Sequence, residues 1–406
     1  MKILHLNNYD KKGGAETVFN LTRQNLKEFE NYSAYVKLDK GPELPDIIFN
    51  SWELNTKLWG IFNYIFSVKN YNKLFKFLET HDINVIHIQG FFSSLSPSIL
   101  FAIKKIKKRK TIRIIQTLHD FHVVCPNSSL FNYNKNEICE KCIGKNFKYH
   151  IFIDRCDRRG FFFSIVKGIR SFTANNIFNH KDIIDHFITP SEFLKNKLIE
   201  DGIKKEKIIV IRNPINRLST KIDFKKENII CYFGRFSREK NLEFLIEAFT
   251  SWKDQTKNNF KLLLIGEGDE EKYLKSITAK NKYSKEIIFK PFLLKDNLAE
   301  EIKYAKYFAM TSKWNENAPM SILEAASLNI LPIVPDFGGM KETVDKVLGI
   351  GRIYKANNIQ SWINAISSLE INYSEEISKL LRAEKNIYTD LSLDSYIKRI
   401  KEIYNN

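Results

Sequence analysis

The two halves of the chain repeat one pattern, in which short apolar runs alternate with segments that have the spacing of an amphipathic helix. In the first half, residues 2–6, 85–88 and 112–117 are expected to be strands, and residues 17–29 and 97–107 are expected to be helices. Such alternation predicts an α/β fold with a parallel sheet covered by helices on both faces.

The same alternation returns in the second half of the chain. One hydrophobic core rarely serves 406 residues, so the length also favours two domains. We therefore predict two Rossmann-like, doubly wound domains that face a central cleft. The expected elements of the second domain are strands at 229–233, 261–265, 287–290, 308–311 and 330–334 and helices at 241–252, 270–280, 298–304 and 322–327.

The domain boundary is predicted at residues 212–218, where a strand-like run ends and Pro214 follows. The first domain is then 1–213, with a cysteine-rich insertion at about 122–160, and the second is 218–385. Residues 386–406 are amphipathic and could pack back onto the first domain as a helix. Ligands are expected between the two domains, because helix N-termini point free amides toward the carboxyl ends of parallel strands.

The net charge of +17 leaves three interpretations open: a nucleic-acid surface, an anionic membrane surface, or a composition rich in Lys throughout. The densest basic segment, 103–113, also contains aliphatic residues, and residues 59–78 suggest an amphipathic aromatic helix. Membrane docking is therefore favoured over nucleic acid, which is not expected as a partner. No run of 18 apolar residues occurs, so we expect a cytoplasmic protein that could attach peripherally to the inner face of the membrane.

A glycine-containing turn follows the first strand of each domain. Gly13 and Gly14 precede the first helix, where a missing side chain lets a ligand approach the backbone and helix amides face an anion. In the second domain Gly234 is followed by Arg235 and Lys240 before the next helix. Arg and Lys together could neutralise a diphosphate without a metal. A tight turn and a solvated basic turn are the structural alternatives.

The sharpest motif is a pair of glutamates eight residues apart, Glu316 and Glu324. Pro319 between them suits a first helical turn, with Asn317 or Ala318 near the cap. If all eight steps were helical, the glutamates would lie about 12 Å apart along the axis. That is wider than a glycosidase pair, at roughly 5 to 9.5 Å. We interpret them as two contacts to one extended ligand rather than one acid and base.

These segments, in this order, resemble the retaining GT-B glycosyltransferases of family 4 over nearly the whole chain. The resemblance implies that Arg235 and Lys240 hold the diphosphate of a nucleotide-sugar donor, that Glu316 contacts its sugar and that Glu324 contacts the ribose. It also implies a sugar-contacting His119, oriented by Asp120 unless that residue caps the next segment. The remaining donor contacts that it implies are Gly13, Gly14, Phe292, Asn317, Ala318, Met320 and Ser321.

The chain departs from the family pattern at two places. Asn241 stands where a glycine often follows the phosphate-binding lysine, and Asn317 to Met320 replace a Gly-Phe-Pro type of segment. Both changes leave the charges intact, so they bear on the identity of the donor sugar more than on the reaction.

Four of the five cysteines cluster in the sequence, as Cys125, Cys139, Cys142 and Cys156. The central Cys-x2-Cys has the spacing of a zinc knuckle, and four thiolates suit a closed structural site. Free thiols, disulfides or another metal remain as alternatives. No cofactor is expected to be needed for catalysis itself.

The predicted activity is transfer of a hexosyl unit, with retention, from a UDP- or GDP-linked sugar to a hydroxyl of a glycan or a polyprenyl-diphosphate-linked acceptor. Bacterial surface polysaccharide or lipopolysaccharide synthesis is the expected setting. Two alternatives stay open: a nucleotide-sugar epimerase or hydrolase with the same cleft, and a zinc-containing nucleic-acid-binding protein.

Overall fold

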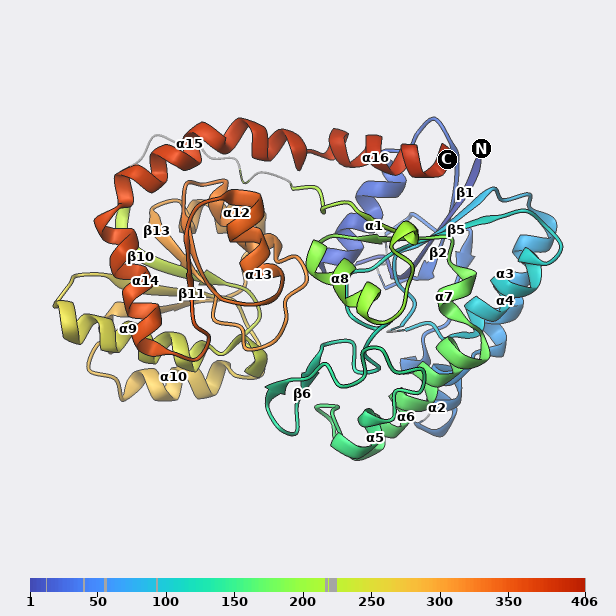
Figure 1. Cartoon of the computed structure of the whole chain (residues 1–406), viewed down its shortest axis with the longest axis horizontal. Helices are drawn as coiled ribbons and strands as arrows, with labels where there is room; N and C mark the ends of the chain where they lie inside the picture. The colour runs from blue at the N-terminus through green and yellow to red at the C-terminus, as the bar shows by residue number, and fades with distance from the viewer. Residues whose placement is uncertain are drawn as a thin grey trace. The chain divides into compact units, whose positions relative to one another are not determined.

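The computed structural model describes residues 1–11, 13–38, 41–54, 57–92, 94–215, 218 and 225–405, and the chain divides into two compact units. The first unit joins Met1–Asn213 to Leu393–Asn406, and the second unit is Pro214–Ser392 (Figure 1). The second unit thus extends beyond the predicted limit at residue 385. Residues 216 and 217 of the predicted junction lie outside the described residues.

The first unit is built on a parallel sheet, which has seven strands in the described residues, in the order β3-β2-β1-β4-β5-β8-β9. This order runs outward in both directions from β1, so right-handed crossovers place helices on both faces. The strands are β1 (Lys2–Tyr9), β2 (Glu30–Val36), β3 (Ile47–Ile48), β4 (Val85–Ile88), β5 (Arg113–Thr117), β8 (His186–Thr189) and β9 (Ile208–Val210). The helices are α1 (Gly14–Gln24), α2 (Lys57–Ile65), α3 (Val68–Thr80), α4 (Ser98–Lys107), α5 (His150–Asp154), α6 (Phe161–Phe172), α7 (His180–Ile183), α8 (Glu192–Glu200) and α16 (Leu393–Asn405).

The second unit contains a parallel sheet of six described strands in the order β12-β11-β10-β13-β14-β15. Its order reverses between β10 and β13, as in doubly wound nucleotide-binding folds. The strands are β10 (Glu227–Phe233), β11 (Lys261–Ile265), β12 (Ile287–Lys290), β13 (Ala305–Ala309), β14 (Leu331–Pro335) and β15 (Arg352–Tyr354). The helices are α9 (Leu242–Thr256), α10 (Glu271–Ala279), α11 (Lys295–Ile302), α12 (Met320–Ala326), α13 (Gly338–Glu342), α14 (Ile359–Ile371) and α15 (Tyr373–Asp390).

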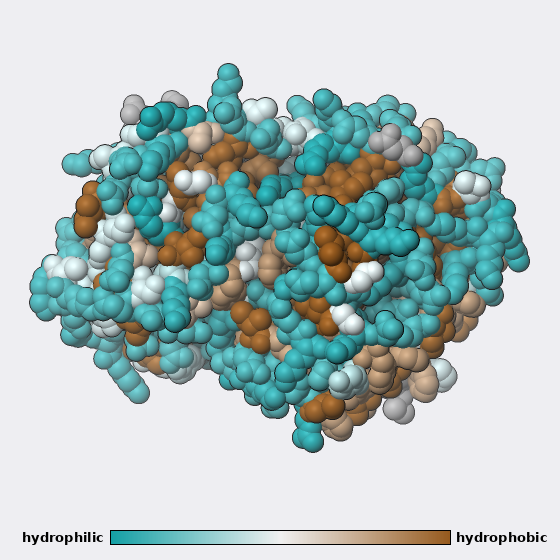
Figure 2. Space-filling model, viewed as in Figure 1, coloured by the Kyte–Doolittle hydropathy of each residue, from teal (hydrophilic) through white to brown (hydrophobic). Residues whose placement is uncertain are grey.

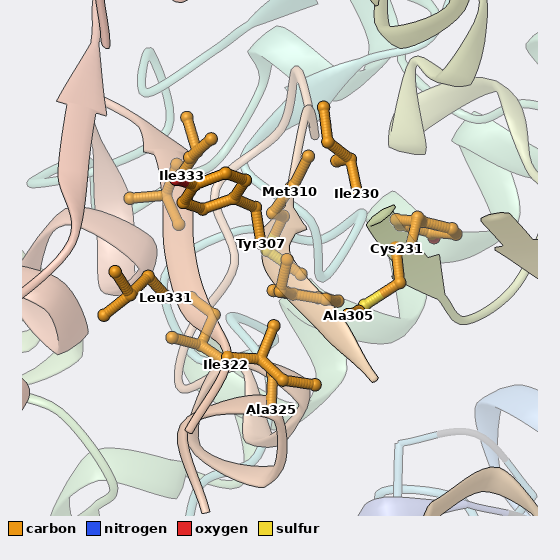
Figure 3. Close-up of a cluster of buried hydrophobic side chains, with 14 of the residues drawn as sticks. Ile230, Cys231, Ala305, Tyr307, Met310, Ile322, Ala325, Leu331 and Ile333 are labelled. Carbon is orange, nitrogen blue, oxygen red and sulfur yellow. The ribbon is translucent and has the colours of Figure 1, made fainter. Parts of the chain in front are cut away.

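The core of the second unit surrounds its central strands. Figure 3 shows Ile322 and Ala325 of α12 packed near Leu331 of β14, with Tyr307 of β13 beside Ile333. All five side chains are at most 1% exposed. The strands are apolar along their whole length because a parallel sheet is buried on both faces. The buried sheet holds in place the strand ends from which the loops of the candidate site emerge.

Two predicted elements differ in the structure. The aromatic stretch 59–78 is two helices, α2 and α3, because Ser67 caps the second one by accepting a hydrogen bond from the Asn70 amide. The strand predicted at 308–311 is β13, Ala305–Ala309, so the apolar run continues past the end of the strand.

The last helix, α16, packs on the first unit. Tyr396, Ile397 and Ile400 join Ile3 and Val18 in one buried cluster. Arg113 of β5 also holds this helix, because its guanidinium donates to the carbonyls of Ile403 and Tyr404 near the end of α16. The chain therefore returns to its first unit after completing the second.

In both units the sheet order reverses beside the first strand, between β1 and β4 and between β10 and β13. Ligands of open α/β sheets bind outside the carboxyl ends of the strands at such a reversal. The loops that follow β1, β4, β10 and β13 are therefore where a site is expected in each unit.

A small elaboration separates β5 from β8. It contains the antiparallel hairpin of β6 (Phe131–Asn132) and β7 (Glu137–Ile138), followed by α5 and α6. The cysteine-rich segment predicted at about 122–160 occupies this region.

Candidate active site

The loop after β10 is packed against the loop after β11. Gly234 has φ +147°, and its amide donates to the carbonyl of Ile265 at 3.0 Å. A Cβ at Gly266 would lie 1.9 Å from the carbonyl oxygen of Gly234, and one at Gly268 would lie 2.2 Å from that of Phe236. Side chains at these two positions would collide with backbone, so glycine is required for the close approach. The loop that carries Arg235 and Lys240 is held by the neighbouring turn.

Lys240 and Glu316 form an ion pair between the loops after β10 and β13. Lys240 Nζ lies 2.5 Å from Glu316 Oε1, and the two side chains are 15% and 14% exposed. The same oxygen accepts hydrogen bonds from Trp314 Nε1 at 2.6 Å and from Ser312 Oγ at 2.9 Å. The ammonium also lies 5.7 Å from the centre of the Trp314 ring. The structure thus brings together two residues that the sequence predicted for one donor.

The environment of Glu316 keeps its carboxyl ionised. Burial works against the charge, but Lys240 and the hydrogen bonds from Trp314 and Ser312 outweigh it and hold the pKa of Glu316 below its ordinary value. In the absence of a ligand, the carboxylate therefore neutralises the lysine that is expected to bind phosphate. A diphosphate at Lys240 must displace or share this partner.

Arg235 lies on the same loop and is more accessible. Its Nη2 lies 3.0 Å from Oε1 of Glu239, and its side chain is 56% exposed while that of Glu239 is buried. Asn241, at the end of the loop, has φ +56°. Asparagine tolerates this left-handed conformation better than most residues, so Asn241 can replace the glycine that the family pattern has there.

Glu324 is half-buried on α12, whose N-cap is Pro319 rather than the predicted Asn317 or Ala318. The helix starts at Met320, and Pro319 is its N-cap with ψ 107°, so Pro319 is not in the first helical turn. The eight steps from Glu316 to Glu324 are consequently not all helical, and the 12 Å axial estimate does not apply. Pro319 itself is extended, so the helix begins only at the residue after it.

The remaining predicted donor residues follow β12 or lie at the start of α12. Phe292 follows β12 and is 59% exposed, as a base-stacking side chain would need to be. Asn317 is buried, whereas Ala318, Met320 and Ser321 are half-buried. Their main chain leads directly into α12.

Further residues of this site were missed from the sequence. Gly339 donates its amide to the Glu316 carbonyl at 2.7 Å, and a Cβ there would lie 1.7 Å from the Asn317 carbonyl. Ser237 Oγ and Asn315 Nδ2 are buried without a hydrogen-bond partner, which is unusual for polar groups unless water or a ligand completes them. The signal for the glycines was present, since strand–glycine–helix junctions also follow β11 and β14.

In the first unit, Gly13 and Gly14 lie at the start of α1, directly beyond β1. Gly13 is the N-cap, and its carbonyl accepts bonds from the amide and hydroxyl of Thr17. A Cβ at Gly14 would meet nothing within 4 Å, so the fold itself does not demand glycine there. The space beside the helix start, lined in part by Gly13, Glu16 and Thr17, is open and has a volume of about 400 Å³.

His119 lies beyond the end of β5 and is held by Gln89, which follows β4. Its Nε2 lies 2.7 Å from Gln89 Oε1, and Gln89 Nε2 donates to Thr22 Oγ1 of α1 at 3.3 Å. Thr22 donates its own hydrogen to the Val18 carbonyl, so the Tyr396 hydroxyl, 2.9 Å away, donates to Thr22. The network thus runs from the C-terminal helix to His119, and no local pattern in the sequence predicts it.

His119 is neutral at pH 7, because burial, aided by His122 and opposed by Asp120, lowers its pKa to about 4. An amide oxygen only accepts, so Nε2 carries the proton and Nδ1 is left as an acceptor. Asp120 does not orient His119: its carboxylate accepts from the amide and the ring Nδ1 of His122, so the capping alternative holds.

The four clustered cysteines are brought close together. Burial raises the pKa of Cys142, and the nearby thiolates of Cys125, Cys139 and Cys156 raise it further; burial likewise raises the pKa of Cys156 to about 12. Among the described residues, however, no group of three or more His, Cys, Asp or Glu side chains is arranged so that it could hold a metal ion. The thiols are free in the structure, and the zinc site stays a prediction.

Comparison with known proteins agrees with the folds of both units. Residues 13–217 match the model of Glycosyltransferase Family 4, and residues 215–388 match that of Glycosyl transferases group 1. An uncharacterised glycosyltransferase of Methanocaldococcus jannaschii is 24% identical over 342 residues, which cover 82% of this chain and 79% of that protein.

Solved structures with the same fold include HepE of Anabaena in complex with UDP, at a TM-score of 0.69 and 16% identity over the whole of both chains. The lipopolysaccharide outer core galactosyltransferase WaaB is also similar, at a TM-score of 0.63 and 16% identity over 99% of this chain and 98% of that one. The architecture is therefore that of the GT-B glycosyltransferases, with two Rossmann-like domains. The chain belongs to glycosyltransferase family 4 and is a glycosyltransferase.

Proposed function

We propose that this glycosyltransferase moves a sugar, with retention of its anomeric configuration, from a nucleoside-diphosphate donor to a hydroxyl of a glycan or lipid-linked acceptor. The observation that carries this proposal is the ion pair of Lys240 and Glu316, located where the sheet order of the second unit reverses. One cation and one carboxylate side by side suit a donor that offers both a diphosphate and sugar hydroxyls.

The donor's diphosphate would be bound by Lys240 and Arg235, which stabilise the charge that develops as the sugar leaves. Glu316, released from Lys240, would accept hydrogen bonds from sugar hydroxyls, and Glu324 would bind the ribose. Phe292 would pack on the base. UDP is the favoured nucleotide, because the similar HepE of Anabaena was solved with UDP and with UDP-glucose. GDP remains the second choice.

His119 would accept a hydrogen bond from a hydroxyl of the transferred sugar through Nδ1, rather than donate one as a cation. For retention we propose displacement on one face of the sugar. The acceptor oxygen bonds to the anomeric carbon as the bond to the diphosphate breaks, and the acceptor proton passes to the departing phosphate oxygen. This path needs no protein nucleophile.

Surface polysaccharide synthesis is the proposed setting, and the structural similarity to a lipopolysaccharide galactosyltransferase supports it. The match to two glycosyltransferase family models gives no support to the nucleic-acid-binding alternative.

The test is nucleoside-diphosphate release from a panel of UDP- and GDP-sugars, with and without a lipid-linked oligosaccharide acceptor. Lys240→Met should lower acceptor-dependent release at least about 100-fold, the upper end of what loss of one bond to a charged group costs. Lys379→Met is the matched control, since Lys379 lies 2.7 Å from Glu375 on exposed α15. Full activity of Lys240→Met would overturn the proposal, and release that needs no acceptor would favour the hydrolase or epimerase.

A further inference from the structure

Helix α6 presents its apolar side chains outward. Phe162, Ile169 and Phe172 are 55%, 42% and 40% exposed, whereas Ser164 and Arg170 on the opposite side are buried. An amphipathic helix on a protein surface normally has the reverse arrangement, with its apolar stripe toward the core. These three side chains of α6 therefore remain about half exposed in the described part of the chain.

The polar side of α6 is fixed by Arg170. Its guanidinium donates to the backbone carbonyls of Phe91, Phe92 and Leu95 and lies 4.0 Å from the centre of the Tyr64 ring on α2. A buried cation with this many partners holds the helix in one rotation about its axis. The outward orientation of the apolar stripe is consequently set by the fold.

Neighbouring elements extend the same surface. Trp59 and Phe62 of α2 are 68% and 65% exposed, with ring centres 6.1 Å apart, and Phe147 contacts Phe172 edge to face at 5.6 Å. Figure 2 shows apolar side chains gathered over α2, α5 and α6, at the lower right. We call the following set the aromatic patch: Trp59, Phe62, Phe147, Phe162, Ile169 and Phe172.

The exposed charges of segment 141–178, which contains four of the six patch residues, have one sign. Residues 141–178 contain eight Lys and Arg against two acidic residues, Asp154 and Asp157. Both carboxylates are buried and ion-paired, Asp154 with two lysines and Asp157 with an arginine and a lysine. Lys145, Arg155 and Arg158 are exposed. The exposed ionised groups of this segment are therefore all cationic.

The basic segment 103–113, which the sequence offers as a candidate membrane surface, lies on other elements, β5 and α4, and carries three ion pairs. Lys107 is ion-paired with Asp185, Arg109 with Glu79 and Lys110 with Asp82. Its aliphatic side chains are buried in the core of the first unit. Three of the seven cations of this segment are thus paired with acidic neighbours.

We propose that the aromatic patch docks on the surface of an anionic lipid bilayer. Aromatic and aliphatic side chains rimmed by Lys and Arg are what an interfacial, non-spanning contact requires. Among the described residues no helix is long and apolar enough to cross a membrane, so the contact is superficial. This inference does not depend on which sugar donor the protein binds. A lipid-linked acceptor would be located in the membrane on which the aromatic patch docks.

The experiment is sedimentation of the full chain with vesicles of phosphatidylcholine alone or mixed equally with phosphatidylglycerol. Wild-type protein is expected to bind the mixed vesicles at low salt. Trp59→Ser/Phe62→Ser should bind them at least tenfold more weakly, since its exposed apolar area is smaller. Ile371→Ser/Leu381→Ser, which removes exposed side chains of α14 and α15, is the matched control and should bind as wild type.

A second variant, Lys145→Gln/Arg158→Gln, keeps the aromatic patch and should lose several-fold affinity for the mixed vesicles, with a weaker dependence on salt. Light scattering is measured in parallel. The proposal would be overturned if the wild-type protein did not bind the mixed vesicles, or if Trp59→Ser/Phe62→Ser bound them equally well. It would also be overturned if the wild-type protein were a dimer that Trp59→Ser/Phe62→Ser dissociates, since the aromatic patch would then contact a second copy of the chain. UDP affinity of each variant, expected unchanged, separates this outcome from failure of the proposed function.

Discussion

Replacing Glu316 by Gln should have opposite effects on nucleotide binding and on sugar transfer. The substitution keeps an oxygen that can accept from Trp314 Nε1 and Ser312 Oγ, at 2.6 and 2.9 Å, but removes the negative charge beside Lys240. A nucleoside diphosphate without its sugar then meets an unneutralised lysine and no competing carboxylate. Its affinity should rise, while the donor sugar loses a charged acceptor for its hydroxyls.

The size of the effect follows from the geometry of the pair. Hydrogen bonds to charged groups contribute about 1.5 to 3 kcal/mol, and exposed ion pairs contribute at most about 1 kcal/mol. The side chains of Lys240 and Glu316 are about one-seventh exposed, so a value near 1.5 kcal/mol is reasonable. That corresponds to about tenfold tighter binding of UDP. Transfer should fall about 10- to 100-fold, for one lost hydrogen bond to a charged group.

The assay is calorimetric titration of UDP into the full chain, paired with initial rates of transfer. Glu375→Gln is the matched control, because it removes the partner of Lys379 on the surface of the same unit. Misfolding would weaken both binding and transfer, so it cannot imitate the predicted result. Unchanged or weaker UDP binding, or unimpaired transfer, would refute the competition between Glu316 and the diphosphate for Lys240.

Three further results are expected. Gly266→Ala should lower the free energy of unfolding by about 3 kcal/mol or more in thermal denaturation, since its Cβ would overlap a backbone carbonyl. Gly14→Ala, with open space around the new Cβ, should leave stability intact and reduce transfer. Equal melting temperatures of the two variants would contradict the packing. Burial lowers the pKa values of His5 and His119 to about 4 in the folded protein, below the value of about 6.5 for histidine in the unfolded chain. Each histidine should therefore cost about 1.4 kcal/mol of folding stability per pH unit as the pH falls from 6.5 to 4. A stability profile that is flat in this pH range would contradict their burial. Metal analysis tests the zinc prediction: about one equivalent per chain, lost in Cys139→Ser, would support it, and metal-free protein with titratable thiols would contradict it.

The sequence was sufficient to predict the two doubly wound units and the loops that carry the site. Apolar periodicity predicts buried strands well because parallel strands are apolar on both faces. Strands β4, β11 and β12 match the predicted ranges. Charged or glycine residues directly after such strands, as at Gly234 and His119, could then be assigned to the carboxyl edge of a sheet.

Pairings between distant segments could not be predicted in the same way. The contact of Lys240 with Glu316 and the contact of Gln89 with His119 each join residues from different loops, and periodicity within one segment carries no information on them. The sequence left two roles open for Asp120, and only the structure shows that its carboxylate accepts from His122, because sequence adjacency does not fix side-chain direction.

The outward orientation of the apolar side chains of α6 could not be predicted from the sequence either. Its pattern is that of an ordinary amphipathic helix, and only the position of Arg170 against backbone carbonyls shows that the apolar side faces outward. The ion pairs of the basic segment 103–113 could not be predicted for a related reason, since partners such as Asp185 come from elsewhere in the chain.

A crystal structure of the full chain with bound UDP tests the central claim most directly. The account predicts the diphosphate beyond the carboxyl end of β10, within hydrogen-bonding distance of Lys240 Nζ and of the Arg235 guanidinium. The direct contact between Lys240 and Glu316, 2.5 Å without ligand, should lengthen or be shared with the phosphate. A nucleotide bound elsewhere, with that ion pair undisturbed, would contradict the account.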